Sequence, residues 1–84
     1  MTVVRMWEAR CAAGCTEEAV AWVQQVAAAD ALEAGASIAE VFRSEDRIVL
    51  LTRWPAPTTW VEPVPDPALV ERFHAWPFES VRDR

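Results

Sequence analysis

Tryptophans, one histidine and a few arginines inside apolar segments are the side chains with which this sequence could bind or transform a ligand. His74 is the only side chain whose ordinary pKa lies near neutrality. It is therefore a candidate general base for the proton of an acidic phenol or enol. The alternative, which we favour, is a histidine at a helix C-terminus that hydrogen-bonds the last carbonyl groups.

Arg5 and Arg53 lie within otherwise apolar segments. A half-buried guanidinium can hold a carboxylate or an oxyanion, so Arg53 is a candidate catalytic residue and Arg5 a candidate substrate-binding residue. The alternative for both is an ion pair with Glu8, Glu40 or a carboxylate of a partner chain, because buried charges are usually paired.

Four tryptophans are candidates for one aromatic-lined binding cavity, with Trp22 nearby. They are Trp7, Trp54, Trp60 and Trp76. Together they would stack a planar, hydrophobic or aromatic small molecule. The alternative is that these rings fill the core or a dimer interface. Trp54 is the strongest candidate for ligand contact, because it ends an apolar strand at the start of an irregular segment and shares a strand face with Thr52.

Cofactor chemistry has little support in this composition. The chain has no Lys, Tyr or Asn, and a single His excludes a multi-histidine metal site. Cys11 and Cys15 form a CxxxC pattern, for which the default is two reduced thiols. We therefore expect no metal and no cofactor.

Length and charge limit the possible partners. The 84 residues predict a single domain, 1–84, and the net charge of −5 argues against nucleic acid as a partner. No apolar run approaches the roughly 18 residues of a membrane span, and no leader is recognisable, so we expect no membrane association and a cytoplasmic protein.

Hydrophobic periodicity predicts the elements of the first two thirds of the chain. Residues 3–11 are predicted to form a strand, and residues 16–34 a helix that ends near Gly35. One face of this helix carries a stripe of apolar residues, which are Ala19, Val20, Val23, Val26, Ala27 and Ala31. Residues 37–43 and 47–54 read as a hairpin, and both faces of its second strand are apolar.

Proline dominates the next segment. Residues 55–67 contain five prolines, and the stretch 55–65 is expected to be irregular and to lie over the mouth of the pocket. Asp66 is then expected to cap a short helix that reaches Phe73. Residues 75–82 read as a final strand, which Pro77 restricts to a sheet edge or a bulge.

This order predicts an α+β fold, a ferredoxin-like split β-α-β arrangement with a four-stranded antiparallel sheet. Helices on one side leave the second sheet face uncovered, although the strands carry apolar residues on both faces. A second copy of the chain is the simplest cover, so we expect a homodimer.

The opening strand VVRMWEAR, the stretch GASIAEVFRSEDRIVLLTRW and the closing AWPFESV together resemble the antibiotic biosynthesis monooxygenase group of dimeric α-β barrel proteins. The resemblance implies a ferredoxin-like protomer whose sheet packs on a partner's sheet. It also implies a ligand pocket between sheet and helices, and a cofactor-independent monooxygenase or related tailoring enzyme acting on a planar aromatic or polyketide-like molecule.

The departures from that group keep two other functions open. Its cofactor-independent oxygenases pair a first-strand Asn with a Trp like Trp54, and this chain has no Asn. Its haem-degrading members add a His soon after that Trp, where this chain has PAPTTWVEPVPDP. The alternatives are a non-catalytic, small-molecule-binding dimeric accessory protein, and a haem-binding or haem-degrading member that uses His74.

Overall fold

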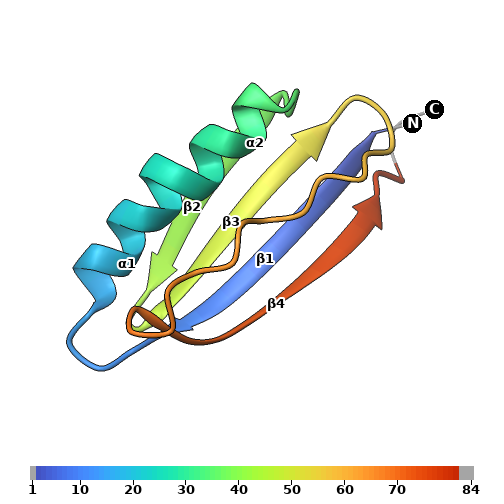
Figure 1. Ribbon diagram of the computed structural model, residues 1–84. Coiled ribbons are helices and arrows are strands. Elements are labelled where there is room, and N and C mark those ends of the chain that lie inside the picture. The colour runs from blue at the N-terminus through green and yellow to red at the C-terminus, as the bar shows by residue number, and fades with distance from the viewer. Residues whose placement is uncertain (1, 82–84) are drawn as a thin grey trace.

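The computed structural model describes residues 2–81, which form a four-stranded antiparallel sheet with one continuous helical stretch against it (Figure 1). The strands are β1 (Val3–Cys11), β2 (Ile38–Ser44), β3 (Arg47–Trp54) and β4 (Val70–Glu79). Their spatial order is β2-β3-β1-β4, and every neighbouring pair is antiparallel. The predicted α+β class and ferredoxin-like strand order are confirmed, with a single helical layer.

One face of the sheet carries the core. Side chains alternate between the faces of a strand, and the alternate residues of β1 and β3 on the helix side are almost fully buried. They are Trp7, Ala9, Cys11, Ile48, Leu50, Thr52 and Trp54. We call the opposite side of the sheet the open face, because no described element covers it (Figure 1).

The open face consists of four cross-strand rows that follow from the strand register. From one end to the other, they are Ile38-Arg53-Val4-Phe78, Glu40-Leu51-Met6-Trp76, Phe42-Val49-Glu8-His74 and Ser44-Arg47-Arg10-Arg72. The first two rows each hold three apolar residues, the third holds two, and the last row holds three arginines.

The helical stretch runs without a break through α1 (Thr16–Trp22), the π-helical segment η1 (Val23–Ala28) and α2 (Ala29–Glu33). Its main buried residues, Ala19, Val23, Ala27 and Ala31, are spaced by four. On a regular α-helix each such step drifts by about 40° around the axis, because a turn holds 3.6 residues. The wider i→i+5 turn of η1 offsets this drift. Val26 was predicted to lie in the stripe, but it is 43% exposed.

Residues 55–69, which we call the strap, replace a second helix. The strap is irregular, as its prolines predict, and it runs along the helix side of the sheet over β1 (Figure 1). The short helix expected after Asp66 is wrong: the backbone N–H groups of Leu69 and Val70 both donate to the Asp66 carbonyl in a turn, and β4 starts at Val70. Pairing with β1 along the whole length of β4 satisfies more backbone groups than one helical turn would.

Strand β4 lies at the sheet edge, as Pro77 predicts, and its residues after Val70 are exposed. Because β4 starts early, His74 lies in mid-strand and not at a helix C-terminus, which corrects our favoured interpretation of that residue. Among residues 2–81, no helix is long and apolar enough to cross a membrane.

Candidate functional site

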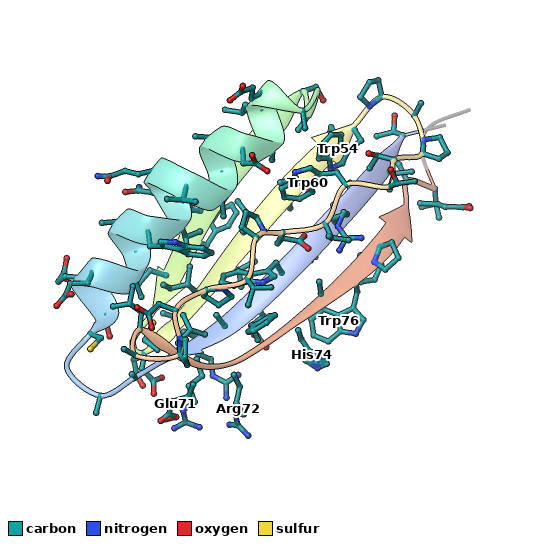
Figure 2. The ribbon with its side chains drawn as sticks, viewed as in Figure 1. Trp54, Trp60, Glu71, Arg72, His74 and Trp76 are labelled. Atoms are coloured by element: carbon teal, nitrogen blue, oxygen red, sulfur yellow. The ribbon has the colours of Figure 1, made fainter. Side chains whose placement is uncertain are left out.

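Trp54 and Trp60 form one aromatic pair on the helix side of the sheet (Figure 2). Trp54 is 3% exposed, and its ring centroid lies 5.2 Å from that of Trp60 on the strap. Its Nε1–H donates to Oγ1 of Thr52 over 2.9 Å. The Nε1–H of Trp60 donates to Oδ2 of Asp30 over 2.9 Å, so the pair links β3, the strap and α2.

Trp7 lies in a second aromatic group, within the main core cluster. It is 1% exposed, and its ring packs 6.4 Å from Trp22 on the helix and 6.1 Å from Phe73 on β4. Its buried Nε1–H has no hydrogen-bond partner within the described residues. Its neighbours are therefore mainly other hydrocarbon surfaces, which is the environment of a core residue.

Trp76 lies on the open face, away from the other tryptophans (Figure 2). It is 41% exposed, and its ring centroid is 4.4 Å from that of His74. The predicted convergence of four tryptophans on one cavity is therefore wrong. The strand register explains the separation, because Trp76 is opposite Met6 whereas Trp7 is opposite Ala75.

Arg5 forms a bidentate ion pair with Glu62 of the strap. Its Nε and Nη2 donate to the two carboxylate oxygens over 3.1 and 2.7 Å, and the side chains are only 14% and 4% exposed. The interpretation of Arg5 as a paired charge is confirmed. Its predicted partners Glu8 and Glu40 lie on the open face, whereas Arg5 faces the strap. The pair holds the strap to β1.

The two catalytic candidates, Arg53 and His74, are not brought together. Both lie on the open face, but Arg53 is opposite Val4 and His74 is opposite Glu8. Four residues of β1 separate these positions, which corresponds to about 13 Å along the strand. Within residues 2–81, no ion-pair partner of Arg53 is found.

Residues 2–81 form at least two pockets on the surface. The first, which we call the strap pocket, has a volume of about 350 Å³ and lies between the strap and β4. It is lined by Val3, Pro57, Thr58, Pro77, Phe78 and Glu79. The proline-rich segment thus borders a pocket, but not the tryptophan-lined pocket whose mouth it was expected to cover, because the lining lacks all four candidate tryptophans.

The second, which we call the arginine pocket, has a volume of about 550 Å³ at the last row of the open face. It is lined by Glu8, Ala9, Arg10, Arg47, Glu71, Arg72, Phe73 and His74. Of these, only His74 was a candidate site residue in the sequence analysis. The three arginines are brought together by two strand registers, which set Arg10 opposite Arg47 of β3 and opposite Arg72 of β4.

Both cysteines are free. The thiol of Cys11 is buried on the helix side, and its burial raises its pKa above the ordinary value of 9.0. A side-chain hydrogen bond with Thr16 acts in the opposite direction and lowers the pKa of this thiol. In the part of the chain that the structure describes, no three His, Cys, Asp or Glu side chains gather as metal ligands.

Comparison with known proteins gives no relative. The chain matches no protein-family model, no curated protein and no solved structure. The resemblance to the monooxygenase group therefore rests on the residue pattern of the strands alone.

Proposed function

We propose that the protein is a homodimer in which two copies pack their open faces together. The observation that carries this proposal is the uncovered apolar surface of the sheet. Its most exposed large side chains are Ile38 at 39%, Phe42 at 49%, Trp76 at 41% and Phe78 at 49%. A contiguous apolar patch over all four strands is typical of an interface and not of a free monomer surface.

A second copy of the chain fits this face in size and in charge. Four strands about 4.8 Å apart and about eight residues long give roughly 500 Å² per copy, or about 1,000 Å² in all, which reaches the size of a specific interface. The open face also carries both negative and positive side chains, with Glu40 on β2 and Arg53 on β3. A two-fold axis can therefore pair unlike charges from the two copies.

We further propose that this dimer binds small planar or apolar molecules without transforming them. The strap pocket has mostly apolar walls with two polar groups, Thr58 and Glu79, which is the composition of a small-molecule site. A monooxygenase of the kind that the resemblance implies would need a substrate cavity between the sheet and the helix. There, Trp7 and Trp54 fill the space as packed core residues.

The test of ligand binding uses 1-naphthol and the quenching of tryptophan fluorescence. Pro57→Glu places a charge in the strap pocket and is expected to weaken binding by about tenfold. Pro55→Glu, at an exposed strap position outside the pocket lining, is the matched control and should bind as the unaltered protein does.

Two results would contradict the binding proposal. One is equal affinity of the Pro57→Glu and Pro55→Glu variants for 1-naphthol, which would remove the strap pocket as the site. The other is oxygen consumption with 1-naphthol above the rate in buffer, which would restore the monooxygenase hypothesis.

A further inference from the structure

Three arginines stand side by side at the end of the open face. Arg10 of β1 is directly opposite Arg47 of β3 on one side and Arg72 of β4 on the other. We call these three residues the arginine row. Like charges directly opposite each other across strands destabilise a sheet, so the row costs stability unless negative charge offsets it.

The protein's own carboxylates offset this charge only loosely. Arg47 lies 3.6 Å from Glu8, and Arg10 lies 3.3 Å from Asp46 and 4.0 Å from Glu71. None of these contacts has hydrogen-bond geometry, and the side chains are 40–52% exposed. Arg72 has no carboxylate within 4.0 Å among the described residues. The guanidinium donors of the row therefore remain available.

Tight pairs elsewhere in the chain show the contrast. Arg5 meets Glu62 at 2.7 Å and Arg43 meets Glu17 at 2.6 Å, both with hydrogen bonds. The loose contacts in the arginine row are thus a local property of this end of the sheet.

A β-bulge beside the arginine row shapes the arginine pocket. The β1–β4 register shifts between Arg10 and Cys11, which leaves Glu71 as the extra residue of β4. A bulge re-aims side chains, and here the consecutive residues Glu71, Arg72 and Phe73 all line the arginine pocket of about 550 Å³. Figure 2 shows Glu71 and Arg72 at the beginning of β4, with His74 and Trp76 farther along the strand.

We propose that the arginine pocket binds the phosphate group of an aromatic organic phosphate. Arginines from three strands can donate several N–H groups to a tetrahedral oxyanion, which would displace Glu8, Asp46 and Glu71 as their partners. Phe73, which also lines the pocket and is 46% exposed, offers an aromatic surface to the ring of the ligand. This site is separate from the strap pocket and does not depend on the proposed binding there.

The experiment compares 1-naphthyl phosphate with 1-naphthol and inorganic phosphate by calorimetric titration. We expect 1-naphthyl phosphate to bind most tightly, with an affinity that falls as salt is added. Arg72→Gln should weaken its binding by about tenfold or more, since a charge-assisted contact is lost. Glu71→Gln should strengthen its binding, because it removes a competing carboxylate.

Arg43→Gln is the matched control, because Arg43 is exposed on β2 and pairs with Glu17 outside the pocket. It should bind 1-naphthyl phosphate as the unaltered protein does. Equal weakening by Arg72→Gln and Arg43→Gln would overturn the proposal. A dimer that dissociates on Arg72→Gln while the affinity for 1-naphthyl phosphate stays unchanged would overturn it too, because the row would then pair with the partner's carboxylates.

Discussion

The indole Nε1–H of Trp54 donates to the hydroxyl of Thr52, two residues earlier on the same face of β3, over 2.9 Å. Thr52 is fully buried, and Trp54 is 3% exposed. Each therefore satisfies a polar atom of the other that water does not reach. This contact, together with the ring of Trp60, gives Trp54 the role of a plug at the end of the core.

A plug and a ligand platform respond differently to Trp54→Phe. We expect this variant to lower the free energy of unfolding in urea by about 1–3 kcal/mol, because it loses packing volume and a buried hydrogen bond. Thr52→Val should cost a similar amount, since it leaves the indole N–H unpaired. The double variant should cost less than the sum of the two. An unchanged stability of Trp54→Phe together with weaker binding of 1-naphthol would show the platform instead.

The buried pair of Arg5 and Glu62 should contribute to stability through the strap. Arg5→Met leaves the Glu62 carboxylate buried without a partner and is expected to cost about 3 kcal/mol. Hydrogen exchange in the strap should accelerate. Arg5→Met combined with Glu62→Leu should recover most of the loss. The control is Arg43→Gln at the exposed pair with Glu17, which should cost less than about 1 kcal/mol. Equal losses at the two pairs would contradict this account of the strap.

The hairpin between β2 and β3 contains a strained residue. Glu45 has φ 54°, a left-handed conformation that disfavours most side chains and suits Asn or Gly. Glu45→Asn should therefore raise the free energy of unfolding by about 0.5–1 kcal/mol. Glu45→Ala removes the same charge without relieving the strain, so thermal unfolding should show no gain for that variant. A similar gain in stability for Glu45→Ala and Glu45→Asn would show that removal of the negative charge, and not relief of backbone strain, stabilises the protein.

The buried thiol of Cys11 should make the folded protein less stable at alkaline pH. Its pKa is raised in the folded state by burial, so the unfolded chain loses the thiol proton first as pH rises. The contribution of this thiol to the free energy of unfolding is fully present below its pKa in the unfolded chain, near 9.0. It is lost as the pH rises through the higher pKa of the folded state. The chain has no Lys and no Tyr, so few other groups titrate there. Urea unfolding from about pH 8 to about pH 11 should show a decline that Cys11→Ala flattens and Cys15→Ala keeps.

The sequence predicted the strands well where hydrophobic alternation is strong. The run of apolar residues in 47–54 led to the correct range of β3, and the single proline of the last strand led to the edge position of β4. The range expected for the last strand, 75–82, was wrong: β4 spans Val70–Glu79, and residue 82 lies outside the described residues. The second helix and the position of His74 were wrong for one reason. Asp66 followed by Pro67 is a local helix signal, and the long-range pairing with β1 outweighs it.

The candidate site was harder to predict, because it depends on which faces meet. Residue type alone does not show that Trp76 and Trp7 occupy opposite faces, since this depends on the register of β4 against β1. The same register brings Arg72 beside Arg10, 62 residues apart in the sequence. Arg5 was expected to pair with Glu8 or Glu40, but only the path of the strap brings Glu62 to it.

The mass of the protein in solution tests the central claim most directly. Sedimentation equilibrium at micromolar concentration should give twice the 9.4 kDa of the chain. Phe42→Glu in the open face should shift the protein toward the monomer, because it buries a charge in the interface. Leu32→Glu, at a 50% exposed position on α2, should leave the dimer intact. A 9.4 kDa species for the unaltered protein would contradict the account, and so would a dimer that Phe42→Glu leaves unchanged.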